Sequence, residues 1–156
     1  MPKNSKRTKN TVYNKRTKKN TNIKSTHKSF EQEIVIEFLQ ILNMIKLYHW
    51  KTDSYATHKA TDELYSKLNE NIDQFIEVLL GKSGGRINLG HIKTISLADF
   101  TSINELKRRL ELFKNYLVDL NSNIALKDMS NFDLYNIRDE ILGNINQFLY
   151  LMTFDK

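Results

Sequence analysis

The sequence predicts an all-α protein: a four-helix bundle with one long crossover connection, preceded by a disordered basic tail. Apolar residues recur at helical spacing in four segments, the pattern of helices that each bury one face. Four of the five glycines fall between residues 81 and 90, and the single proline is Pro2, so helix breakers are almost absent elsewhere. A chain of 156 residues suits one domain with a buried core, which we place at residues 29–156.

The predicted tail, residues 1–28, differs in charge from the rest of the chain. It carries ten basic and no acidic residues, against 14 basic and 18 acidic residues afterwards, so the two parts have charges of +10 and −4. Because the tail has few large apolar side chains to bury, we expect it to be disordered. Cations that neutralise phosphates release counterions, so we expect the tail to bind DNA independently of sequence. The candidate DNA-binding residues are Lys3, Lys6, Arg7, Lys9, Lys15, Arg16, Lys18 and Lys19. A solubilising tail and, over residues 14–19, a nuclear import signal are the alternative interpretations.

The first two helices are predicted from caps and apolar stripes. Ser29 and Gln32 have the spacing of a capping box, so we expect the first helix to begin near Ser29. The second helix is expected from about residue 54 to residue 80, where Gly81 would end it. The first stripe consists of Ile34, Phe38, Ile41, Ile45 and Tyr48.

The last two helices follow a connection at about residues 81–100. Ser102 and Glu105 form a second capping-box pattern, and the third helix is expected to begin near Thr101 or Ser102. The fourth helix is expected to begin near Ser130 or Asn131. Short first and third links with a long second link describe a bundle with one crossover. A simple up-and-down bundle with a mobile loop is the alternative and would have the same core.

Metal-ligand side chains lie along one flank of the predicted second helix. The five candidates are His49, His58, Asp62, Asp73 and Glu77. The last four fall within about 100° on a helical wheel, beside the apolar stripe. His58 with Asp62, and Asp73 with Glu77, are i, i+4 pairs separated by roughly 22 Å along the axis. Each pair can share an ion, but only two copies around a two-fold axis can join the pairs, so we expect a homodimer with shared sites.

The donor types restrict the chemistry of such a site. Imidazole and carboxylate together suit Fe(II), Mn(II) or Zn(II), and hard oxygen ligands with open positions favour Fe(II) oxidation. On spacing alone, a solvated acidic flank and structural histidines are the more ordinary interpretation. We interpret His27 and His91 as non-ligands, and the absence of cysteine excludes a thiolate site. The chain has no run of about 18 apolar residues, so no membrane span is expected.

These residues also resemble a known family. The run Tyr48-His49-Trp50, followed by His58, Asp62, Asp73 and Glu77, resembles the Dps miniferritins. The likeness is closer still to a Dps-like family of phages and large DNA viruses, and the segments that carry it are His49-Trp50, residues 54–60 and residues 136–140. The resemblance covers residues 30–82 well and the C-terminal part loosely. The sequence departs from the Dps pattern in lacking the glycine after the His-Trp pair and in a shorter turn before His58.

The resemblance implies a ferritin-like fold and a dodecameric shell that oxidises Fe(II) with peroxide or oxygen and stores the iron. It implies that His49, His58 and Asp62 come from one subunit, and that Asp73 and Glu77 come from its neighbour. It also implies DNA binding through the basic tail. The expected location is the cytoplasm, the nucleoid or a virion, or the nucleus if the host is eukaryotic. The alternative function is a structural oligomer that condenses nucleic acid and keeps a vestigial metal site.

Overall fold

The computed structural model describes residues 7–127 and 129–154, with side chains described from residue 27 onward. These residues contain α-helices and short 3₁₀ helices and no β-strand, which confirms the predicted all-α class. The α-helices are α1 (Arg7–Lys51), α2 (Tyr55–Ser83), α3 (Ile103–Asp119) and α4 (Phe132–Leu151). Two 3₁₀ helices, η1 (Leu120–Ser122) and η2 (Ile124–Leu126), connect α3 to α4. Within the described ranges, we find no helix whose length and hydrophobicity would let it cross a bilayer.

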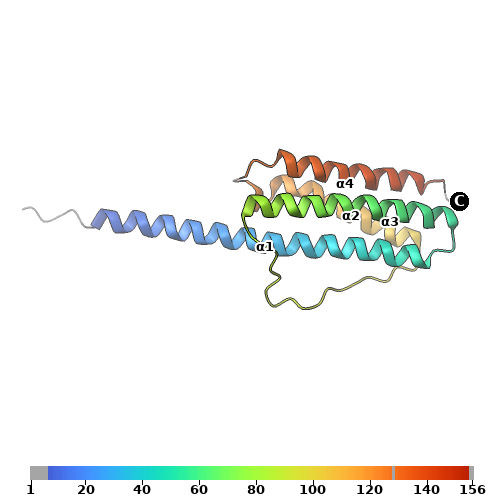
Figure 1. The fold of residues 1–156 in the computed structure, drawn as a ribbon, viewed down its shortest axis with the longest axis horizontal. Helices are drawn as coiled ribbons and strands as arrows, with labels where there is room; N and C mark the ends of the chain where they lie inside the picture. The colour runs from blue at the N-terminus through green and yellow to red at the C-terminus, as the bar shows by residue number, and fades with distance from the viewer. Residues whose placement is uncertain (1–6, 128, 155–156) are drawn as a thin grey trace, which may run out of the picture.

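The four α-helices form a bundle in which every packed pair is antiparallel. The helix α1 packs against α2 and α3, and α4 packs against the same two helices. Both α2 and α3 run opposite to α1, whereas α4 runs in the same direction as α1 (Figure 1). Because α2 and α3 share a direction, the chain between them must travel the length of the bundle. The long connection that the sequence predicts is therefore required by the packing.

The connection, residues 84–102, is held against α1 along its course. The side-chain amide of Gln32 donates to the backbone carbonyl of Asn88 at 2.7 Å. Near the other end of the connection, the Lys51 ammonium donates to the Asp99 carboxylate at 2.5 Å. The connection thus follows α1 in the same direction, so it covers one side of α1 rather than leaving the bundle as a free loop.

Three phenylalanines from three helices meet at the centre of the core. The rings of Phe38 (α1) and Phe75 (α2) have centroids 5.4 Å apart with planes at 87°. Those of Phe38 and Phe113 (α3) are 6.0 Å apart at 81°. Edge-to-face pairs of this kind add to the stabilisation from apolar burial. The helix α4 completes the core with Leu134, Ile137, Ile141, Ile145 and Phe148, all buried.

The helix ends confirm one cap and correct another. The Ser102 hydroxyl accepts from the Glu105 backbone N–H, and the Glu105 carboxylate accepts from the Ser102 N–H, so the predicted capping box is confirmed. The predicted end of α2 at Gly81 is wrong, because α2 continues to Ser83 and ends at Gly84. Gly84 adopts a φ of 70° and its N–H donates to Leu80 O, a left-handed cap that glycine adopts without strain.

The start of α1 also differs from the prediction. The sequence predicts disorder for residues 1–28 and a helix start near Ser29, whereas α1 begins at Arg7 and projects beyond the bundle (Figure 1). No glycine or proline interrupts the chain between residues 7 and 51. A helix that the bundle has already nucleated therefore extends backward by one hydrogen bond per residue without a new nucleation cost. Lys3 and Lys6 lie outside the described residues.

Candidate functional site

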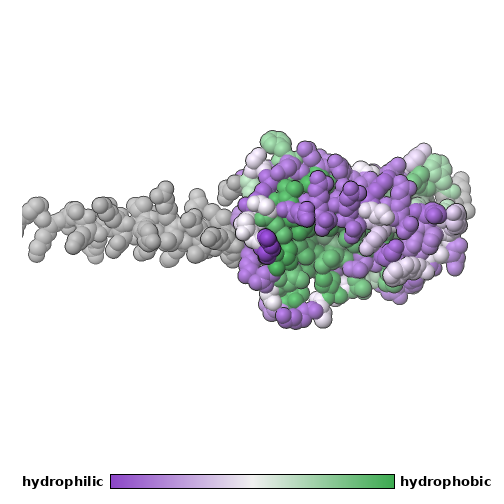
Figure 2. Space-filling view, in the orientation of Figure 1, coloured by the Kyte–Doolittle hydropathy of each residue, from purple (hydrophilic) through white to green (hydrophobic). Residues whose placement is uncertain are grey.

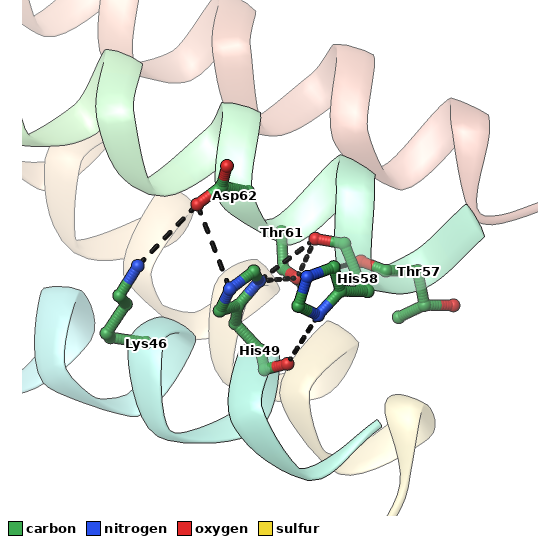
Figure 3. A network of polar contacts seen from close by, with 6 residues as sticks. All are labelled: Lys46, His49, Thr57, His58, Thr61 and Asp62. Carbon is green, nitrogen blue, oxygen red and sulfur yellow. Dashed lines mark hydrogen bonds and ion pairs between the residues drawn. The ribbon is translucent and has the colours of Figure 1, made fainter. Parts of the chain in front are cut away.

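Two predicted ligands, His49 and His58, meet beside the turn that joins α1 to α2 (Figure 3). Ser54 begins α2 as its N-cap, with its hydroxyl accepting from Thr57 N–H at 3.2 Å. This short turn brings the last turn of α1 and the first turn of α2 together. The two imidazole rings stack, with centroids 3.9 Å apart and planes at 24°. The His49 side chain is buried and His58 is partly buried.

Backbone carbonyls fix which nitrogen of each ring carries a proton. Nδ1 of His49 lies 3.0 Å from the carbonyl oxygen of His58. Nδ1 of His58 lies 3.1 Å from the carbonyl oxygen of His49. A carbonyl oxygen can only accept, so each Nδ1 carries the proton and donates it. In the neutral rings Nε2 is then an acceptor, as in metal-binding histidines whose other nitrogen donates to a carbonyl.

Thr61 supports this arrangement from inside α2. Its side chain is fully buried, and its hydroxyl lies 2.7 Å from the Thr57 carbonyl oxygen, to which it donates. The same oxygen lies 3.3 Å from His49 Nδ1. His49 is therefore fixed by contacts from two successive turns of α2. Sequence analysis missed Thr61. Its position next to Asp62, and one helical turn after Thr57, could have indicated that it lies beside the candidate site.

Asp62 brings a carboxylate to the exposed edge of the His49 ring. Its Oδ1 lies 3.8 Å from His49 Nε2. The same oxygen lies 3.5 Å from the Lys46 ammonium. When His49 is neutral, its Nε2 lone pair and the carboxylate face each other as two acceptors, an arrangement that a cation stabilises. Lys46 supplies that positive charge in this structure.

Lys46 is a second residue of the site that sequence analysis missed. Its ammonium lies 4.9 Å from the centroid of the Tyr65 ring and 5.8 Å from that of Trp50. Two aromatic faces and one carboxylate therefore hold the ammonium in place. The usable signal was its position on α1 one turn before His49 and Trp50.

The two other predicted ligands lie apart from this cluster. Asp73 and Glu77 are exposed on α2, at roughly 16 Å and 22 Å from Asp62 along the helix axis. In the described part of the chain, no three histidine, aspartate or glutamate side chains are placed to hold a metal ion. One chain thus brings His49 and Asp62 together, with the His58 ring stacked on that of His49, and leaves Asp73 and Glu77 apart from them.

The remaining sequence-predicted residues are not at this cluster. His91 is exposed in the long connection, and His27 lies at the opposite end of the bundle, beside Lys28. The side chains of the candidate DNA-binding residues, which all precede residue 27, lie outside the described ones.

Comparison with known proteins places this site within a family. Residues 49–152 match the family described as "Family of unknown function (DUF5856)". The chain belongs to this family. The DUF5856 match begins at His49 and includes α2, α3 and α4, so it contains His58 and Asp62.

The chain is also similar to an uncharacterised 14.6 kDa protein of Enterobacteria phage T4 from the mobD-ri intergenic region. The two are 31% identical over 123 residues, which cover 76% of this chain and 88% of the phage protein. No solved structure matches the chain significantly.

Proposed function

We propose that this chain is a Dps-like, ferritin-like protein that binds Fe(II), oxidises it and stores the product, at sites shared between two subunits. The observation that carries the proposal is the pair of acceptors His49 Nε2 and Asp62 Oδ1, 3.8 Å apart. Bonds from a metal to imidazole nitrogen or carboxylate oxygen are about 2.0–2.2 Å, so two such donors on one ion stand at most about 4.4 Å apart. The observed separation fits that limit. Iron is the substrate and cargo in this proposal, and Mn(II) or Zn(II) would suit the same donors.

The proposed reaction takes one electron from each of two Fe(II) ions. One peroxide molecule accepts both electrons and, with two protons, becomes two water molecules; oxygen is the alternative oxidant. Asp62 contributes negative charge that favours the more highly charged Fe(III) product. His49 contributes a neutral nitrogen donor whose orientation the His58 carbonyl holds.

An apolar face supports the pairing of two subunits. Figure 2 shows apolar side chains gathered over α1 and α2, in the half of the bundle from which α1 projects. A groove of about 240 Å³ lies there, lined by residues that include Leu39, Ile76 and Asp73. Leu39 is 38% exposed on this groove, and a contiguous exposed apolar surface of this kind suits contact with a second copy. Antiparallel packing of two such faces would bring Asp73 and Glu77 of one copy toward Asp62 of the other.

Two further observations support the wider proposal. A bundle with a single long crossover is the connectivity of ferritin-like folds, and a dodecameric shell would be built from the dimers described above. The similarity to a phage T4 protein supports a place in the infected cell or the virion, beside nucleic acid. The basic residues 1–28 would provide the contact with DNA.

Iron oxidation by the full-length protein tests the proposal. We expect Fe(II) with peroxide to give an absorbance rise that Asp62→Asn slows by at least about tenfold, because a carboxylate ligand is lost. The double variant Asp73→Asn/Glu77→Gln should show the same loss. A matched control, Glu70→Gln/Asp119→Asn, removes one glutamate and one aspartate that are exposed elsewhere and should leave the rate unchanged.

Mixing the two defective variants tests whether sites are shared. In a heterodimer of Asp62→Asn with Asp73→Asn/Glu77→Gln, one site would carry every substitution and the other none. Random exchange of subunits mixed in equal amounts should therefore make about a quarter of all sites intact. A rate unchanged in both variants would overturn the ferroxidase assignment, and loss without recovery on mixing would overturn the shared site.

A structural oligomer that condenses nucleic acid and keeps a vestigial metal site is the second candidate. The position of Lys46 favours it, because the ammonium already neutralises Asp62 without any metal. If this second function is correct, the protein condenses DNA equally well with and without metal. Fe(II) oxidation in its presence then proceeds at the same rate as in buffer alone. Light scattering of DNA mixtures in the presence of a chelator measures the first of these outcomes.

A further inference from the structure

A second polar pocket lies at the opposite end of the bundle from the histidine pair. It opens between α1, the end of α2 and the connection that follows, and has a volume of about 480 Å³. The charged or titratable side chains that line it are His27, Lys28, Glu31, Lys82 and Arg86. Three permanent cations therefore face one carboxylate across an open cavity. Such a balance favours an anionic ligand.

Structural roles account for only one of these three cations. Lys82 forms an ion pair with Asp133 at 3.0 Å and donates to the carbonyl of Ser130, which ties the end of α2 to the start of α4. Within the part of the chain that the structure describes, the Arg86 guanidinium donates to the carbonyl of its neighbour Gly85, at 2.9 Å. Lys28 and Arg86 are exposed, and neither has a carboxylate partner among the residues that the structure describes.

The wall that carries Arg86 is fixed to α1. The bond from Gln32 to the Asn88 carbonyl holds the start of the connection beside the helix that carries Lys28. Gly84 reverses the chain at the end of α2 and directs the connection toward α1. Lys28 and Arg86 therefore line one cavity, from α1 and from the connection, rather than lying on unrelated parts of the surface.

We infer that this pocket is a phosphate-binding site on the bundle, and that it takes a phosphodiester of nucleic acid. Lys28 is the last of the ten basic residues of the N-terminal segment. Because α1 is one continuous helix from Arg7 to Lys51, that basic segment leads directly to the pocket. A nucleic acid lying along the segment would place its next phosphate between Lys28 and Arg86. The inference rests on the DNA-binding part of the proposed function and adds a contact that the basic tail alone does not supply.

The salt dependence of DNA binding tests the inference. Each phosphate contact contributes about 0.9 to the slope of log K against log salt for duplex DNA. We expect Lys28→Gln/Arg86→Gln in the full chain to reduce that slope by about one on a mixed-sequence duplex, because one phosphate contact is lost. The control Lys59→Gln/Arg108→Gln removes one lysine and one arginine that are exposed elsewhere, and should change the slope by less than about 0.3.

The outcomes separate the pocket from the tail. A Lys15→Gln/Arg16→Gln variant tests the tail. If the salt slope falls in this variant but equals that of the wild type in the pocket variant, the pocket assignment alone is overturned. Equal losses in the pocket variant and its control would overturn the pocket as well, since general charge would explain both. Binding of inorganic phosphate by the wild type but not by the pocket variant, with the duplex affinity unchanged at fixed ionic strength, would assign the pocket to free phosphate instead. Absence of DNA binding by the wild-type chain would overturn both ideas.

Discussion

The side chains of His49 and His58 hold each other in place through each other's backbone. Nδ1 of each ring lies within 3.1 Å of the carbonyl oxygen of the other residue, and the rings stack face to face. The short turn between α1 and α2 makes this exchange feasible, because it places the last turn of α1 against the first turn of α2. The pair therefore joins two helices while also setting the direction of each Nε2.

The exchange predicts a stability cost for His58→Ala. This substitution removes the donor to the His49 carbonyl and the stacked ring, so we expect a loss of about 1–2 kcal/mol in the free energy of unfolding. Urea unfolding followed by circular dichroism measures the change. The control is His91→Ala, in the exposed part of the connection, where a change within about 0.5 kcal/mol is expected. Equal stability of the two variants would contradict the role of the pair.

Lys46 is expected to compete with a metal ion for Asp62. Its ammonium lies 3.5 Å from the carboxylate, so Lys46→Met removes the competing charge while keeping an unbranched apolar side chain. We expect Zn(II) to bind about fivefold more tightly, the equivalent of about 1 kcal/mol for a partly exposed ion pair. Isothermal titration of the wild type, of Lys46→Met and of the control Lys59→Met measures this. A weaker affinity in Lys46→Met would mean that Lys46 positions Asp62 instead of competing for it.

The two glycines near the end of α2 should respond to alanine with opposite signs. Gly81 is inside the helix with no neighbouring atom within 4 Å of an added Cβ, so Gly81→Ala should stabilise by about 0.5–1 kcal/mol. Gly84 has a φ of 70°, so Gly84→Ala should destabilise by about 1–2 kcal/mol. Thermal unfolding of the two variants compares them directly. A shift of the same sign in both would contradict the placement of the cap at Gly84.

These glycines also show where sequence reasoning succeeded and where it failed. The presence of four helices was predictable from the spacing of the apolar residues, because only a helix places the residues of each apolar stripe on one buried face. The end of α2 was not predictable from the sequence, because Gly81 and Gly84 are both glycines at which a helix could end. Only the backbone conformation, a positive φ at Gly84, shows which of them is the cap. The start of α1 failed for a related reason. Ser29 and Gln32 have capping-box spacing, but a helix that is already formed passes through such a pair without using it.

The candidate site was predictable only in part. His49, His58 and Asp62 were identified by residue type and spacing, and the structure brings them together. Lys46 and Thr61 were missed because neither residue type is a usual metal ligand, and their roles depend on how α1 and α2 face each other. The contribution of a second subunit stays a prediction, since it depends on packing between copies.

The exposed apolar face predicts that one charged side chain will separate the subunits. Leu39 lies on the groove and is 38% exposed, so Leu39→Asp should disrupt an interface without opening the core. We expect a monomer at concentrations where the wild type is at least a dimer, measured by light scattering after size-exclusion chromatography. Leu112→Asp is the control, because Leu112 is 58% exposed on α3 and does not line the groove. Dissociation by the control alone would place the interface on α3.

The capping box of α3 predicts a dependence of stability on acid pH. The backbone N–H of Thr101, followed by its hydroxyl and the N–H of Ser102, lowers the pKa of the Glu105 carboxyl below its usual value. A carboxyl with a lowered folded-state pKa stabilises the fold above its unfolded-state pKa, and this contribution is lost as pH falls through the lower folded-state value. The wild type should therefore lose more stability between neutral pH and the acid range than Glu105→Gln does. Urea unfolding at several pH values measures the difference, with Glu70→Gln as a control whose pH dependence should match that of the wild type. Parallel curves for Glu105→Gln and wild type would show that the cap does not depend on the charge of Glu105.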